Sequence, residues 1–218
     1  MIKLKYRSIV YYSAFLAVLA LASQARAQKV DVYFGMGTAS DGAASDASCP
    51  APKQIRDSTN ACVGAPIIGG TFGVIGGDAF FLPHIGVNFE DSFRFRQASY
   101  VPTDGLNARQ SFYDFNAVYE PLASDSKIVP VVEGGIGGTK VSIYFNQSIC
   151  PLCGSQSGLL TSVNHFQVHG AVGVKLYVRS NIFFKPQVDF HYVPSLNQQY
   201  GSNFVPQYTL SIGYSFGR

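Results

Sequence analysis

The 218-residue chain has little charge and no tryptophan. Only 13% of its residues are charged, roughly half the fraction of about 25% in soluble domains, so it cannot build an ordinary soluble surface. Outside the first thirty positions there is no run of about 18 apolar residues, which excludes a helical membrane protein. Disorder is excluded as well, because 47% of the residues are apolar and 14% are aromatic.

The first 27 residues have the pattern of an export signal. Three basic residues precede an apolar run over residues 9–22, and Ala25-Arg26-Ala27 forms the small-x-small pattern of a signal peptidase site. We expect a secretory signal peptide over residues 1–27, Sec-type export and cleavage after Ala27.

The mature chain, residues 28–218, has a different charge balance from the whole sequence. Cleavage removes four of the sixteen basic residues and none of the thirteen acidic ones, so twelve basic residues remain against thirteen acidic and the net charge becomes −1. No clustered basic patch remains, so we expect no nucleic-acid partner.

The four cysteines fit an oxidising compartment. Of the three possible pairings, the most local joins Cys49 to Cys62 and Cys150 to Cys153, each pair within its own loop. The alternative, a redox-active or zinc-binding Cys-x-x-Cys, is disfavoured because no strand-to-helix pattern precedes Cys150.

Strand periodicity extends through the mature chain. Eight segments of about ten residues alternate apolar and polar side chains, and helical spacing is not sustained anywhere. Seven of the segments are 29–37, 66–76, 110–120, 128–145, 162–178, 182–193 and 207–216. The remaining one, third along the chain, follows a tight turn at 76–78 and ends near residue 96.

The fifth segment changes parity along its length. Val132 and Ile136 have one parity, and Val141 and Ile143 have the other. A β-bulge within the glycine-rich stretch 134–138 would restore a single apolar face, so we predict a bulge there.

The connections alternate in length, which is typical of a transmembrane β-barrel with short periplasmic turns and long extracellular loops. We therefore predict an all-β fold, an eight-stranded antiparallel up-and-down transmembrane β-barrel. The long connections are 38–65, 97–109, 146–161 and 194–206, and the short ones are 77–78, 121–127 and 179–181.

The polar face indicates which side meets lipid. It mixes charges of both signs with small residues, which suits the narrow interior of eight strands, whereas the aromatic-rich face suits lipid. The alternative, a soluble lipocalin-like carrier of an apolar ligand, would need more surface charge. We expect a lumen charge network formed by Glu90, Arg94, Arg96, Asp114, Glu133, Lys175, Lys185 and Asp189.

The last segment places apolar residues at every second position and ends on an aromatic residue, followed by Gly217 and Arg218. It resembles the C-terminal signal that the assembly machinery reads in small outer-membrane proteins of the OmpA N-terminal domain and OmpX-like superfamily. The residues that carry this resemblance are Tyr208, Leu210, Ile212, Tyr214 and Phe216.

The resemblance implies a cell outer-membrane location, contact with outer-membrane lipid and lipopolysaccharide, and a monomer. Because this superfamily includes structural proteins, adhesins and lipid A-modifying enzymes, the fold alone does not settle the role.

Residues suited to catalysis are few. His191 and Ser195 do not form the histidine-x-serine motif of the lipid A deacylases. His165 and His169 are four apart on one strand, about 13 Å at 3.3 Å per residue, too far to share a metal. We therefore expect no enzyme activity, no cofactor and no metal, with the histidines as hydrogen-bonding residues of the lumen.

The expected role lies in the loops. A filled lumen disfavours the alternative of a narrow channel for small solutes. Disulfides restrict the loops and preorganise them for contact. We expect a structural or adhesin-like surface-contact role, with an unidentified surface ligand.

Overall fold

The computed structural model describes residues 29–41, 45–56, 59–101, 105–122, 126–148, 155–194, 196 and 200–217. The predicted signal peptide at 1–27 and its cleavage site lie outside the described residues. Cys150, Cys153 and Ser195 also lie outside them. Within the described residues, no helix is long and apolar enough to cross a membrane.

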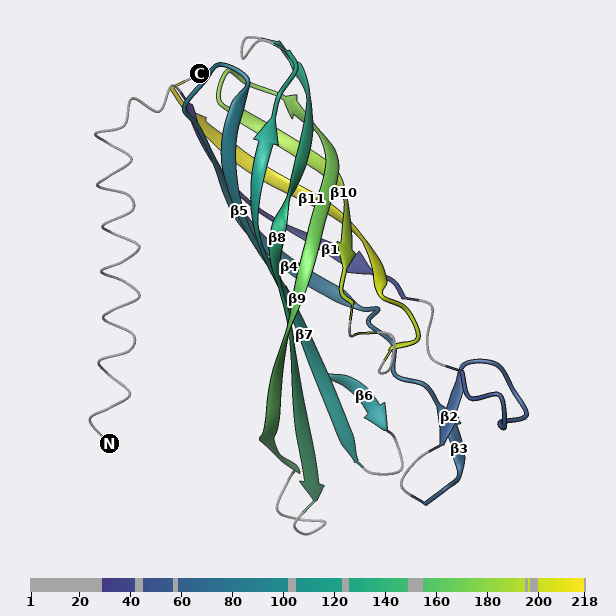
Figure 1. The fold of residues 1–218 in the computed structure, drawn as a ribbon. Helices are drawn as coiled ribbons and strands as arrows, with labels where there is room; N and C mark the ends of the chain where they lie inside the picture. The colour runs from purple at the N-terminus through teal and green to yellow at the C-terminus, as the bar shows by residue number, and fades with distance from the viewer. Residues whose placement is uncertain are drawn as a thin grey trace.

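Eight strands of the described residues close into an antiparallel barrel (Figure 1). Each is hydrogen-bonded to the next one along the chain, and β11 pairs with β1 to close the ring. The barrel strands are β1 (Lys29–Ala39), β4 (Thr71–Phe80), β5 (Ile85–Arg94), β7 (Leu106–Tyr119), β8 (Ile128–Ser148), β9 (Ser155–Tyr177), β10 (Ile182–Tyr192) and β11 (Phe204–Phe216).

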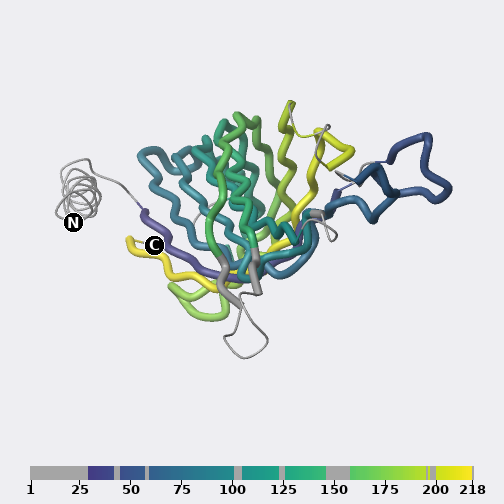
Figure 2. The backbone as a smooth tube through the Cα atoms, turned by 90° about the horizontal axis from the view of Figure 1, so that it is seen from below, coloured from purple at the N-terminus to yellow at the C-terminus, as the bar shows by residue number. Residues whose placement is uncertain are grey.

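Three short strands lie at one end of the barrel. β2 (Gln54–Arg56) and β3 (Cys62–Gly64) form a separate hairpin, and β6 (Ala98–Val101) pairs with the start of β7. The first and last barrel strands run side by side, so both ends of the described chain lie at the opposite end, with the short turns (Figures 1 and 2). The prediction of an up-and-down eight-stranded barrel is confirmed.

The outer surface of the barrel is apolar and the inner surface is polar. Along β1, Phe34 is 67% exposed, whereas its neighbour Tyr33 is 3% exposed and Asp31 is fully buried. Phe115 on β7 and Ile136 on β8 also point outward, with 60% and 57% of their surfaces exposed. Exposed apolar side chains around a polar interior suit lipid outside, and they contradict the lipocalin-like alternative, which needs the reverse.

Glycine allows close approach of aromatic rings across the sheet. Tyr33 lies opposite Gly76 inside the barrel, and a Cβ at Gly76 would lie 2.6 Å from Cζ of the tyrosine ring. The same arrangement recurs for Phe183 opposite Gly213.

These contacts explain why one turn was predicted in the wrong place. Gly76 and Gly77 are within β4, and the turn to β5 is at 81–84, so the predicted turn at 77–78 is wrong. The glycines make room for a neighbouring strand and ring and do not reverse the chain.

The predicted bulge at 134–138 is also wrong. β8 keeps a regular register with β7 and β9 through these glycines, and the register shift comes later, between Ile143 and Tyr144. The parity changes because Val141 points inward, where it is 1% exposed within an apolar cluster. The prediction assumed that the interior is polar along its whole length.

Two apolar clusters inside the barrel likewise explain the second predicted segment, since one contains Ile68 and Phe72 and the other contains Val74. Ile68 and Phe72 are fully buried and Val74 is 3% exposed, so this apolar set faces the interior and not lipid. The predicted long loop at 146–161 is largely strand, since β8 extends to Ser148 and β9 begins at Ser155. Figure 1 shows β7, β8 and β9 continuing past the other strands at this end.

Candidate functional site

The interior of the barrel at the end with the short turns is an ion-pair cluster around Lys175. Its ammonium group donates to Asp31, to Asp78 at 2.6 Å and to Glu120 at 2.7 Å. Lys29 donates to the second carboxylate oxygen of Glu120 at 2.6 Å. Burial of three carboxylates is tolerated here because two ammonium groups compensate them.

A second ion pair lies nearer the middle of the barrel. Lys185 donates to Glu133 at 2.6 Å, and its ammonium group lies 4.2 Å from the ring centroid of Tyr33. The Tyr33 hydroxyl donates to Glu90 at 2.7 Å. These side chains fill the cross-section with hydrogen-bonded groups.

A histidine cluster lies beyond the Lys185–Glu133 pair, closer to the end of the barrel where the β2–β3 hairpin lies. His169 on β9 and His191 on β10 are direct partners across the two strands, and their rings stack with centroids 4.8 Å apart. Asp189 Oδ1 lies 3.4 Å from His169 Nε2, and Asp114 Oδ2 lies 3.8 Å from His191 Nδ1.

An apolar cluster lies inside the barrel at the end nearest the β2–β3 hairpin. Phe112 stacks on His191 with centroids 4.3 Å apart, and Phe72 packs on Phe112. Tyr200, from the connection between β10 and β11, is fully buried in the cluster and accepts a hydrogen bond from Gln110 at 2.5 Å. The other members are Ala39, Ile68, Ala108, Val141, Val193, Leu196 and Val205. Polar and apolar side chains together occupy the interior.

The predicted lumen residues fall into two groups. Seven of them are buried inside the barrel: Glu90, Arg94, Asp114, Glu133, Lys175, Lys185 and Asp189. Arg96 is exposed, so its assignment to the lumen is wrong. β5 ends at Arg94 and the chain bends at 95–96, so strand alternation no longer determines which way a side chain points.

Some partners in the interior differ from those expected. Arg94 donates to the side-chain oxygen of Gln110 at 3.2 Å, so one of its partners is uncharged. Lys29 and Asp78 were missed. Asp78 lies in the predicted turn at 76–78, and Lys29 begins the predicted strand at 29–37. Lys29 has the same strand parity as Asp31, and Asp78 has the same parity as Gly76. This parity could have predicted that both side chains face the interior.

The histidine pairing was also missed. The sequence suggests only the combinations His165 with His169 and His191 with Ser195, because these residues are close along the chain, and it disfavours both. The structure instead brings His169 and His191 together from adjacent antiparallel strands. Only the register of β9 against β10 determines that contact.

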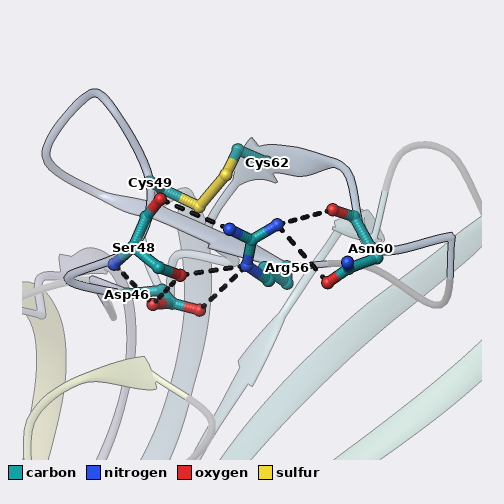
Figure 3. Close-up of a disulfide and its surroundings, with 6 residues drawn as sticks. All are labelled: Asp46, Ser48, Cys49, Arg56, Asn60 and Cys62. Carbon is teal, nitrogen blue, oxygen red and sulfur yellow. Dashed lines mark hydrogen bonds and ion pairs between the residues drawn. A yellow bond between two sulfur atoms is a disulfide. The ribbon is translucent and has the colours of Figure 1, made fainter.

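Outside the barrel, one loop is built around a disulfide (Figure 3). Cys49 and Cys62 are bonded, as predicted. Arg56 lies beside the bond and donates to the Ser48 hydroxyl at 2.9 Å and to the Asn60 carbonyl at 2.8 Å (Figure 3).

Asp46 supports the same loop. Its Oδ1 accepts hydrogen bonds from the Ser48 hydroxyl at 2.6 Å and from the Ser48 amide at 2.8 Å. These two bonds, with a smaller contribution from the charge of Arg56, hold the pKa of the Asp46 carboxyl below its usual value.

The residues of the predicted assembly signal are on the outer face of β11. Their side chains alternate with buried polar residues, so they present one apolar row to the membrane. The row consists of Tyr208, Leu210, Ile212, Tyr214 and Phe216.

Comparison with known proteins gives the fold. No protein-family model and no curated protein matches the chain. Among solved structures, it is similar to the outer membrane protein OprG from Pseudomonas aeruginosa, with 14% identity and a TM-score of 0.55 over 87% of this chain and 96% of that one. It is also similar to a major outer membrane protein from Thermus thermophilus, with 13% identity and a TM-score of 0.56 over 86% of this chain and 99% of that one.

At these identities the likeness shows the fold alone. The closed ring of eight strands, with an apolar outer face and a polar interior, has the architecture of the small outer-membrane β-barrel proteins. The turns at 81–84 and 178–181 lie at one end of the barrel and the β2–β3 hairpin lies at the other. In small outer-membrane barrels the short turns face the periplasm and the long loops face the cell exterior.

Proposed function

We propose that this chain is an integral outer-membrane protein that does not conduct solutes and acts through its extracellular loops in contact with other surfaces. The observation that carries the proposal is the filled interior. Buried ion pairs occupy its periplasmic half, and the apolar cluster around Phe72, Phe112 and Tyr200 covers the extracellular end. The proposal assigns the chain no catalytic step.

The channel alternative is tested by conductance. Purified refolded protein inserted in planar bilayers is expected to give no steady single-channel current, because ions would have to displace hydrogen-bonded charges and a buried apolar cluster. A general porin under the same conditions serves as the positive control. A stable, large current would overturn the filled-lumen proposal.

The loops support the surface-contact part of the proposal. The β2–β3 segment projects away from the barrel in both views (Figures 1 and 2). Its disulfide and the Arg56 hydrogen bonds reduce the number of conformations that the free loop can adopt, which lowers the entropic cost of binding.

Deletion of residues 40–63 tests this part. Cells that express the deletion variant are expected to bind less to host or neighbouring cell surfaces, while the amount of folded barrel is unchanged. The double variant Cys49→Ser/Cys62→Ser is the matched control that keeps the loop but removes its cross-link, and it should have an intermediate effect. If the deletion variant keeps its surface binding and envelope integrity, the surface-contact role is contradicted and a purely structural role is supported.

The same proposal assigns partners to the outer face. The apolar belt would contact outer-membrane lipid and lipopolysaccharide, and the outward row of β11 would be read by the outer-membrane assembly machinery. Both follow from an apolar surface that only a bilayer or a folding catalyst can cover.

A further inference from the structure

We propose that the barrel interior contains a binding site for one divalent transition-metal ion, formed by His169, His191 and Asp114. Donor atoms of Asp114, His169 and His191 all lie within 4.8 Å of one another, and all three residues are buried. Asp189 lies next to the group, with Oδ1 3.4 Å from His169 Nε2, and this oxygen also accepts a hydrogen bond from Gln187.

Hydrogen bonds set the tautomer of His169. Asp78 can only accept, so Asn88 donates its amide group to it at 2.6 Å, and the Asn88 oxygen accepts from Asn116 at 2.9 Å. The Asn116 oxygen therefore faces His169 Nδ1, 2.9 Å away, and Nδ1 must carry the hydrogen. In the neutral ring, the lone pair is then on Nε2.

His191 is oriented in the same way. The Gln207 amide nitrogen donates to the hydroxyl of Ser92, so the Gln207 oxygen faces His191 Nε2 at 3.0 Å. His191 Nε2 carries the hydrogen and Nδ1 carries the lone pair. Metal-binding histidines typically donate the hydrogen of their other ring nitrogen to such a neighbour, which fixes the ring and raises its basicity.

Both lone pairs face carboxylates. His169 Nε2 and His191 Nδ1 are buried and make no hydrogen bond within the described part of the chain. The first faces Asp189 and the second faces Asp114, and a carboxylate offers acceptors only. Each ring nitrogen therefore faces an acceptor, although Gln187 also donates to Asp189 and Gln167 to Asp114. Lone pairs that face each other in this way are unfavourable unless a cation is present.

The barrel's own cations are engaged elsewhere. Lys29 and Lys175 bind Asp31, Asp78 and Glu120, and Lys185 binds Glu133. The other acidic cluster of the interior, Asp31 with Asp78 and Glu120, already surrounds the Lys175 ammonium group. The histidine cluster has no such ammonium group among the described ion pairs.

A metal ion fits the cluster better than two protons do. Protonation of both rings would place two positive charges on stacked imidazoles whose centroids are 4.8 Å apart. One divalent ion supplies the same charge at one point and can bind the donors of Asp114, His169 and His191. A tetrahedral site with bonds of about 2.0–2.2 Å places its donors about 3.3–3.6 Å apart. The observed contact between His191 Nδ1 and Asp114 Oδ2 is 3.8 Å, and the three grouped donors all lie within 4.8 Å of one another.

The donor set indicates the class of metal. Two imidazoles and one carboxylate suit Zn²⁺, Co²⁺, Ni²⁺ or Cu²⁺, whereas Mg²⁺ and Ca²⁺ prefer oxygen donors alone. Because Phe112 covers His191 on the extracellular side, the ion would be taken up while the barrel closes.

The test is refolding from denaturant into detergent with Zn²⁺ or with a chelator, followed by gel filtration and measurement of metal content. We expect about one Zn²⁺ per chain and a higher unfolding temperature in the Zn²⁺ sample, because a ligand that binds only the folded state stabilises it. Refolding with Co²⁺ should give the visible absorption of a tetrahedral site.

Two variants and a control make the test specific. His169→Gln and Asp114→Asn should each weaken Zn²⁺ binding about 10-fold or more, since loss of an outer-shell partner alone costs about 10–100-fold. Asp114→Asn keeps an oxygen that can accept from Gln167, so the barrel should still form even if His169→Gln fails to fold. His165→Gln, four residues away on the same strand, should bind Zn²⁺ as the unchanged chain does.

Two results would overturn the proposal. One is Zn²⁺ content in the unchanged chain no higher than in Asp114→Asn. The other is an unfolding temperature that rises with acidity and is insensitive to Zn²⁺. That result would mean that protons, and not a metal ion, stabilise the histidine cluster.

Discussion

Lys175 shows how single side chains sustain this interior. It is fully buried and is surrounded by three carboxylates, which come from β1, from β4 and from Glu120, the residue that follows β7. Removing one partner of a buried ion pair leaves uncompensated charge, which costs more than the pair itself contributes. The interior is therefore more sensitive to the loss of one lysine than an exposed surface would be.

We expect Lys175→Met to lower the free energy of unfolding by about 3–5 kcal/mol, because Asp31, Asp78 and Glu120 lose their shared partner. Urea titration in detergent micelles, followed by circular dichroism, measures this decrease in the free energy of unfolding. Lys127→Met, an exposed change in a periplasmic turn, is the control and should stay within about 0.5 kcal/mol. Equal effects of the two changes would contradict the role of the Lys175 cluster.

At the scale of elements, the extracellular segment around β2 and β3 is organised separately from the barrel. Its sheet is distinct from the barrel sheet, and its contacts are a disulfide and short-range hydrogen bonds. Asn60 adopts a left-handed backbone conformation with φ of 66°, which asparagine tolerates better than most residues. Local chemistry is therefore sufficient to shape this segment.

The order of this segment should depend on acidity. The pKa of Asp46 is lowered by its two hydrogen bonds from Ser48, so the folded loop favours the ionised carboxylate. Its contribution is present above the usual aspartate pKa of about 3.9 and is lost as pH falls through the lower pKa of the folded loop.

NMR of the Ser48 amide across the acid range measures this dependence. The chemical shift should titrate with a midpoint below that of a free aspartate, and the titration should vanish in Asp46→Ala. A midpoint at the usual value would contradict the hydrogen-bonded arrangement.

At the scale of the whole molecule, closure is the decisive property. Because β11 pairs with β1, no barrel strand is left as an open edge, and the backbone groups of the wall are paired between strands. The long extracellular hairpin of β8 and β9 adds pairs beyond the wall.

Such a barrel should resist SDS until it is heated. Unboiled protein is expected to migrate differently from boiled protein, and reduction of the Cys49–Cys62 bond should leave the shift intact because that bond lies outside the barrel. Identical mobility before and after boiling would contradict a closed membrane barrel.

The sequence by itself determined the strand periodicity, the number of strands, the alternation of turns and loops, and the Cys49–Cys62 pair. These are local properties: an alternation of period two marks a strand whatever its neighbours are, and two cysteines thirteen apart in one loop can meet without the rest of the fold. Lys185 and Glu133 could be assigned to the inner face in the same way.

Tertiary structure alone decided where the interior turns from polar to apolar and which side chains meet inside it. Val141 and Phe72 have the pattern of lipid-facing residues, yet they point inward because loop residues such as Tyr200 close over that end. Asp78 meets Lys175, and His169 meets His191, only through the registers of paired strands. Periodicity assigns a side chain to a face, but the height at which it meets a partner depends on strand register and stagger, which no single segment encodes.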